Sequence, residues 1–162
     1  MGADLCQYHL NICSQQKVLY SIAMKQMIMN KIIALDTNIL VYCHSNDEPD
    51  KQKTAVSFFS MCPVISTQVL SEYINVIKRK LKLPKDKIMD VCLQNIEMCI
   101  LQPVSMTTLK HARNLLDRYD FQLFDSIVVA SALEAGCHTL YSEDLHHGLL
   151  VESRMKIINP FI

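Results

Sequence analysis

The chain has 162 residues, half of which are hydrophobic, and its 16 basic and 16 acidic side chains leave a net charge of zero at pH 7. This length suits one domain with a sizeable core, and zero net charge excludes nucleic-acid binding through an overall positive field, so a local patch or metal ions would have to supply it. No stretch approaches the ~20 apolar residues of a membrane span, and the seven dispersed cysteines, an odd number, favour reduced thiols in a cytoplasmic protein with no membrane partner.

Residues 1–28 differ in composition from the rest of the chain. The segment mixes polar and apolar residues and lacks the continuous apolar region of a secretion signal, so we interpret it as an N-terminal extension without a catalytic role. Its Cys6, His9 and Cys13 are too few and too loosely paired for a structural zinc site, which needs four ligands. The compact domain is expected over residues 29–162.

From residue 32 onward, short apolar runs alternate with segments of helical periodicity. The predicted strands are 32–35, 64–66, 99–101, 138–141 and 156–158. The predicted helices are 39–44, 50–61, 67–83, 86–97, 108–119 and 122–135. Because strands separated by helices imply right-handed crossovers, we predict an α/β fold with three layers, α/β/α, and a mostly parallel sheet of four to five strands.

Four carboxylates occur where these elements meet. Asp36 directly follows the apolar run 32–35, and Glu72 lies near the start of the helix after the second strand. Asp125 lies in the first turn of the last helix, and Asp144 follows the fourth strand. Strand ends and the helix starts that follow them share one edge of a parallel sheet, so we expect all four side chains to line one cleft.

Carboxylates packed together are costly unless a cation lies between them. Two unit charges about 4 Å apart repel by about 4 kcal/mol at an effective dielectric constant near ~20, and such neighbours raise one another's pKa. The oxygen ligands on offer suit Mg²⁺ or Mn²⁺ and argue against zinc or copper. We therefore predict a site for one or two such ions. It would favour phosphodiester hydrolysis, because the ion activates water and offsets charge on the phosphate.

Each acid also has a simpler interpretation. Asp36 would serve as a helix N-cap, Glu72 as a solvated helix residue, and Asp125 as an acid favoured at a helix N-terminus by the macrodipole. Glu143 could take the role of its neighbour Asp144. Two interpretations of the adjacent serine at position 142 stay open, either as the cap of a turn or as a partner of metal-bound water.

Four short motifs surround the acids, namely IALDTNIL at 33–40, SEY at 71–73, FDS at 124–126 and LYSEDL at 140–145. Their order and spacing resemble those of PIN-domain ribonucleases, and in particular the VapC-type toxins of toxin–antitoxin pairs. The resemblance covers residues 29–162. It implies a three-layer α/β/α fold, a divalent-metal site and cleavage of RNA.

By this resemblance, the four acids look like catalytic metal ligands and their polar neighbours look like supporting residues. The ligands would be Asp36, Glu72, Asp125 and Asp144. The supporting residues would be Thr37, Asn38 and Ser142. The family also suggests a homodimer and a cognate antitoxin that inserts a peptide, often with an arginine, into the acidic cleft.

A basic segment follows Glu72 on the same predicted helix, and residues 78–87 hold six cations and one acid. These cations would steer RNA toward the cleft through phosphate contacts. Alternatively, they form a solvated helix end where the dipole favours positive charge. The residues assigned to RNA binding are Lys78, Arg79, Lys80 and Lys82. Other cations that would extend the same surface are Lys110, His111, Arg113 and Arg118.

Other functions remain open. An aspartyl phosphatase would use a nucleophile after the first strand, but it usually needs a second Asp where Asn38 stands. A phospho-receiver or other interaction domain would be non-catalytic, and a receiver needs its acceptor after a middle strand. Two further alternatives are a PIN-fold nuclease of RNA processing and a PIN-fold protein that has lost its activity.

Overall fold

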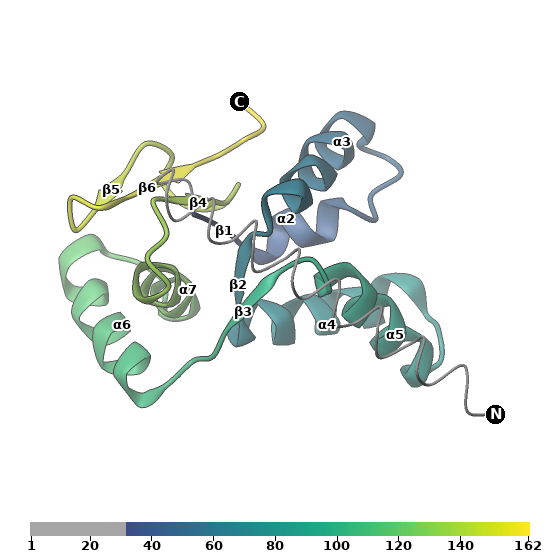
Figure 1. Cartoon of the computed structure of the whole chain (residues 1–162), viewed down its shortest axis with the longest axis horizontal. Helices are drawn as coiled ribbons and strands as arrows, with labels where there is room; N and C mark the ends of the chain where they lie inside the picture. The colour runs from purple at the N-terminus through teal and green to yellow at the C-terminus, as the bar shows by residue number, and fades with distance from the viewer. Residues whose placement is uncertain (1–31) are drawn as a thin grey trace, which may run out of the picture.

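Six strands form one sheet in the order β3-β2-β1-β4-β6-β5 in the computed structural model of the chain (Figure 1). The structure describes residues 32–162, so the predicted extension at 1–28 and its Cys6, His9 and Cys13 lie outside the described residues. The strands are β1 (Ile33–Leu35), β2 (Val64–Ser66), β3 (Ile100–Gln102), β4 (Thr139–Tyr141), β5 (Leu150–Val151) and β6 (Met155–Ile158). All neighbouring pairs are parallel except β5 with β6, which is antiparallel.

Helices cover both faces of this sheet, as the three-layer α/β/α prediction requires. The α-helices are α2 (Thr37–Tyr42), α3 (Pro49–Ser57), α4 (Thr67–Leu81), α5 (Lys85–Ile96), α6 (Met106–Tyr119) and α7 (Leu123–Glu134). Figure 1 shows α6 and α7 together on one side of the central strands, with α2, α3, α4 and α5 on the other. The predicted fold class is confirmed.

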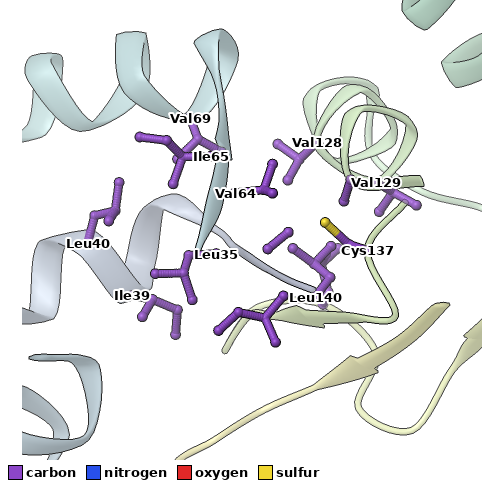
Figure 2. Packing of buried hydrophobic residues seen from close by; sticks show 14 of the residues in the cluster. Leu35, Ile39, Leu40, Val64, Ile65, Val69, Val128, Val129, Cys137 and Leu140 are labelled. Atoms are coloured by element: carbon purple, nitrogen blue, oxygen red, sulfur yellow. The ribbon is translucent and has the colours of Figure 1, made fainter. Parts of the chain in front are cut away.

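Alternation along the strands explains this layering, because successive strand side chains point to opposite faces. Figure 2 shows Leu35 and Ile65 pointing toward α2 and α4, whereas Val64 points toward Val128 and Val129 of α7. All five of these side chains are buried. The core therefore lies on both sides of the short central strands and leaves their carboxyl ends free for polar side chains.

Most element boundaries differ from the prediction by one or two residues. The predicted helix 50–61 is α-helical only to Ser57 and ends in one 3-10 turn, Phe58–Met61. Helix α4 stops at Leu81 rather than at residue 83, because Lys82 adopts a left-handed conformation (φ 49°) and the residue before Pro84 is disfavoured in a helix. The sheet has six strands rather than the predicted four to five, because β5, which was not predicted, is only two residues long and too short for a periodic signal.

No helix within residues 32–162 is both long enough and apolar enough to cross a lipid bilayer.

Candidate functional site

The structure brings all four predicted acids to one cavity of about 390 Å³ at the carboxyl edge of the sheet. Asp36 directly follows β1, and Asp144 follows β4, the neighbour of β1 on one side. Glu72 projects from the second turn of α4, which follows β2 on the other side, and Asp125 from the first turn of α7. We call this hollow, defined by Asp36, Glu72, Asp125 and Asp144, the acid cavity.

Asp36 is the most constrained of the four. It is the N-cap of α2, and its Oδ1 accepts a hydrogen bond from the backbone N–H of Thr37 at 2.7 Å. Its Oδ2 accepts one from the Ser142 hydroxyl at 2.7 Å and a longer one from the Asn38 amide at 3.4 Å. The N-cap interpretation and the site interpretation of Asp36 therefore hold together, because capping uses one oxygen and leaves the other toward β4.

Burial, together with the charge of neighbouring carboxylates, raises the pKa of two acids of the cavity. Burial raises the pKa of Asp36 to about 6, against the lowering effect of the hydrogen bonds from Ser142 and Thr37, and the charges of Asp125 and Glu72 add to the rise. Burial also raises the pKa of Asp125, and the charges of Glu72 and Asp144 raise it further. Asp36 and Asp125 thus lie close enough to other carboxylates of the cavity for those charges to oppose their ionisation.

The three predicted supporting residues each tie two parts of the cavity together. The Thr37 hydroxyl donates to Oε2 of Glu72 at 2.9 Å. The Asn38 amide donates to Oδ2 of Asp144 at 3.1 Å, besides its contact with Asp36. Hydrogen bonds of this kind fix carboxylate orientation before any ligand arrives.

Ser142 caps a turn and also contacts the first acid. Its Oγ accepts the backbone N–H groups of Asp144 and Leu145, both at 3.2 Å, while its hydroxyl hydrogen goes to Asp36. Ser142 is fully buried. Of its two open interpretations, the structure therefore supports the turn cap, which here also positions an acid.

Glu143 lines the same cavity, but the charge of its carboxylate is already compensated by a lysine. Its carboxylate accepts hydrogen bonds from Nζ of Lys51 at 2.6 Å and from the Tyr42 hydroxyl. Burial alone would raise the pKa of Glu143, but these two contacts outweigh burial and hold it below its ordinary value. Asp144, in contrast, has a carboxylate whose only hydrogen-bond partner among the described residues is the Asn38 amide, so it is the freer of the two to bind a cation.

Sequence reasoning missed the Lys51 contacts. Lys51 also pairs with Glu48 at 3.1 Å, and its Nζ lies 4.5 Å from the ring centroid of Tyr42 and 5.3 Å from that of Phe161. These contacts join α3 to the loop that carries Asp144. Nothing in the sequence signals this pairing, because Lys51 and Glu143 are 92 positions apart.

The predicted RNA-binding cations divide into separate places. Lys80 lines the acid cavity itself. Lys78 and Arg79 line a neighbouring hollow of about 450 Å³ that shares Glu72 with the acid cavity. Lys82 ends α4 and lines neither of these hollows.

Three of the more distant cations are paired with acids. His111 lies 3.2 Å and Arg118 3.4 Å from Oε1 of Glu152, and Arg113 pairs with Asp117. Because these acids partly compensate their charge, the three side chains would attract a phosphate backbone less strongly.

The donor set of the acid cavity fits a hard divalent cation. All its candidate ligands are oxygens, and none of the four acids forms an ion pair with a Lys, Arg or His of the described residues. Among residues 32–162, no three His, Cys, Asp or Glu side chains are grouped closely enough to hold one ion by themselves. This arrangement suits Mg²⁺, which keeps several waters and takes one or two carboxylates plus substrate oxygens, and it does not suit a closed zinc site.

A mostly parallel sheet with acids gathered at its carboxyl edge defines the class of α/β proteins that place a polar site between adjacent strand ends. The family model of the PIN domain matches residues 33–148, more than half of the chain. The protein therefore belongs to the PIN domain family, whose members are nucleases.

Three solved structures share the fold. A toxin–antitoxin complex from Klebsiella pneumoniae aligns with a TM-score of 0.59 at 16% identity, covering 81% of this chain and 98% of that one. The sarcin–ricin loop cleaving toxin VapC20 of Mycobacterium tuberculosis aligns with a TM-score of 0.55 at 18% identity, covering 69% of this chain and 89% of that one. VapBC2 of Rickettsia felis, bound to a DNA fragment from its promoter, aligns with a TM-score of 0.52 at 21% identity, covering 70% of this chain and 88% of that one. At these identities the likeness shows the fold. No curated protein matches the sequence.

Proposed function

We propose that this PIN-domain protein is a divalent-metal-dependent ribonuclease that hydrolyses RNA phosphodiester bonds and acts as the toxin of a toxin–antitoxin pair. The observation that carries the proposal is the acid cavity, where carboxylates from four separate elements meet without a compensating ion pair among residues 32–162. Family membership supports nuclease chemistry, and the fold shared with toxin–antitoxin complexes supports the toxin assignment.

In this proposal the four acids hold one or two Mg²⁺ or Mn²⁺ ions. Such an ion, when bound, would activate water for attack and offset the charge that develops on the phosphate. The protein's own contribution is to fix the ligands in advance. Asp36 is held by Thr37 and Ser142, and Asn38 spans the gap between Asp36 and Asp144. This limits the reorganisation that substrate binding requires.

Basic residues would bind the RNA backbone beside the cavity. Lys80 lines the cavity and would contact the phosphate nearest the reaction. Lys78 and Arg79 line the next hollow along α4 and would bind a phosphate further along the strand. Lys82 would contribute only long-range attraction, which salt screens.

We further propose that the protein acts in the cytoplasm, forms a homodimer and is inhibited by a cognate antitoxin. An arginine of that antitoxin would pair with the acids of the cavity and compete with the metal ion. The antitoxin complexes among the structures that share this fold support such a partner.

The test is cleavage of a mixed RNA pool by purified protein with Mg²⁺, with Mn²⁺ and with excess EDTA, followed by mapping of the product ends. We expect cleavage with either metal and none with EDTA. Asp36→Asn and Asp125→Asn should abolish cleavage. The matched control is Asp47→Asn, which removes an exposed acid from a turn outside the cavity. Full activity of either cavity variant, or cleavage in EDTA, would contradict the proposal.

Growth assays separate the toxin from its nearest alternative. Expression of the wild-type chain should arrest growth, and co-expression of a small protein encoded beside it should restore growth. Metal-dependent cleavage without growth arrest would instead favour a PIN nuclease of RNA processing, and folded protein without cleavage would favour an interaction domain.

A further inference from the structure

A second hollow, of about 380 Å³, adjoins the acid cavity and shares Asp125 and Asp144 with it. This volume lies within the roughly 300–1,000 Å³ range of small-molecule sites. The other side chains that matter for its chemistry are Tyr119, Phe121, Gln122, His146 and Leu149. We call it the aromatic hollow. The function proposed above assigns it no role.

The turn between α6 and α7 builds this hollow. Helix α6 ends at Tyr119, and Asp120 is its C-cap, in the left-handed conformation (φ 56°) in which helices commonly end. The turn leaves the rings of Tyr119 and Phe121 stacked, with centroids 5.7 Å apart and planes 29° apart.

Contacts from outside the turn hold the Tyr119 ring in place. Its hydroxyl accepts the backbone N–H of Glu152 at 2.8 Å, and the Arg118 guanidinium lies 5.4 Å from its centroid. Gln122, in contrast, is exposed and makes no side-chain hydrogen bond within the described residues, although it is the N-cap residue of α7. The hollow thus combines a fixed aromatic wall with a free amide donor and acceptor.

Charge decides which part of a nucleotide fits here. Asp120, which is not one of the four proposed metal ligands, lines the hollow, so a phosphate there would be repelled. A nucleobase is neutral, stacks on aromatic rings and carries amino and imino donors that suit carboxylates and the Gln122 amide. Phosphates would bind more favourably in the hollow beyond Glu72, which Lys78 and Arg79 line.

The acid cavity lies between these two surroundings. It shares Asp125 and Asp144 with the aromatic hollow, and it shares Glu72 with the hollow lined by Lys78 and Arg79. A strand passing through the acid cavity would therefore meet a base-binding surface on one side and a phosphate-binding surface on the other.

We propose that the aromatic hollow binds the nucleobase next to the scissile phosphate of single-stranded RNA, by stacking on the Tyr119 and Phe121 rings and by hydrogen bonding to Gln122. This inference rests on the ribonuclease function proposed above. It makes the hollow a determinant of which base flanks the cleaved bond, and it restricts the substrate to unpaired nucleotides, because a base inside a duplex cannot enter.

The test compares Phe121→Leu, which removes the ring but keeps apolar volume, with Phe121→Tyr, which keeps the ring. Cleavage of a random-sequence RNA pool in Mg²⁺, with mapped ends, reports base preference beside the cut, and a single oligonucleotide reports KM and kcat. We expect Phe121→Leu to lose the preference and to raise KM about tenfold, within the range for loss of base–aromatic stacking, with a smaller change in kcat. Phe121→Tyr should restore both.

A binding measurement separates this inference from the nuclease proposal. Single-stranded RNA carrying 2-aminopurine is titrated with the Asp36→Asn protein in Mg²⁺, since Asp36 does not line the aromatic hollow. Quenching of 2-aminopurine fluorescence is expected, and the added Phe121→Leu change should abolish it. Thermal melting of each variant identifies any that fails to fold, in which case Gln122→Ala replaces it, with loss of base preference as its expected result.

Each other outcome counts against one proposal. If wild type cleaves but Phe121→Leu and Gln122→Ala keep its base preference and KM, the hollow is not a base site, although the nuclease function stands. If wild type does not cleave under any condition, the nuclease function fails and the quenching result alone decides on the hollow. If Phe121→Leu leaves cleavage unchanged but abolishes inhibition by an arginine-containing peptide, the hollow is a peptide site and the inference is overturned.

Discussion

Replacement of Asp36 by asparagine should stabilise the metal-free protein at neutral pH. Burial raises the pKa of Asp36 from 3.8 to about 6, so the folded state binds this proton more tightly than the unfolded chain does. A pKa difference of one corresponds to about 1.4 kcal/mol, and the contribution of Asp36 is therefore roughly 3 kcal/mol. This contribution favours folding below pH 3.8 and is lost as the pH rises through about 6.

Asparagine removes the charge but not the helix cap. Its carbonyl oxygen can still accept the Thr37 N–H, whereas the contact with Ser142 is weakened at a cost of about 1 kcal/mol. We therefore expect the Asp36→Asn variant to gain about 1–2 kcal/mol in free energy of unfolding at pH 8, and to gain nothing or lose slightly at pH 4.

Urea denaturation in EDTA at pH 8 and at pH 4 measures this difference, with Asp47→Asn as the exposed control. Addition of Mg²⁺ supplies a second readout that does not depend on catalysis. Wild type should gain stability by mass action, about 2.7 kcal/mol at a hundredfold excess over the dissociation constant, and Asp36→Asn should gain much less. An Asp36→Asn protein no more stable than wild type at pH 8 in EDTA would refute the reasoning from burial.

Three further variants test the surroundings of the site. Tyr73→Phe removes a fully buried hydroxyl that lies 2.5 Å from both His44 and Asn95. Urea denaturation should show that this variant loses about 1–3 kcal/mol in free energy of unfolding. The control Tyr141→Phe, where the described residues show no hydrogen bond to the hydroxyl, should lose much less. Lys51→Met should leave Glu143 unpaired beside the acid cavity and reduce cleavage rates at saturating RNA, and an unchanged kcat would exclude a positioning role for Lys51. Lys80→Ala should raise KM for RNA and make KM less dependent on salt concentration. The control Lys53→Ala, on the exposed face of α3, should have the KM of wild type. Equal KM values for the two lysine variants would show that Lys80 does not contact RNA.

Much of the fold could be predicted because its signals are local. The apolar runs predicted the bounds of β1 and β2 to within one residue, and the alternation of strands and helices predicted the three-layer arrangement. Strand β5 could not be found, because two residues define no period and the strand exists only through pairing with β6. The end of α4 depends on a left-handed residue at Lys82 that periodicity does not show.

The grouping of the acids followed from topology, whereas their charge state did not. A residue after a strand must lie at the carboxyl edge of a parallel sheet, so Asp36 and Asp144 were bound to be neighbours once β1 and β4 paired. The depth at which Asp36 is buried, and hence its raised pKa, depends on packing from α2 and β4. The pairing of Glu143 with Lys51 and the stacking of Tyr119 on Phe121 likewise require coordinates.

The central place of β1 has a consequence for engineering this protein. With β2 on one side and β4 on the other, Asp36 stands one strand spacing, about 4.8 Å, from the strands that lead to Glu72 and to Asp144, whereas Asp125 is reached from β3 through α6. The margins of the sheet, β3 and β5, are each separated from β1 by at least one intervening strand. Insertions at β5, which leads to none of the four acids, should therefore leave the site intact, whereas a shift of a single residue in β1 would move Asp36 away from its partner acids.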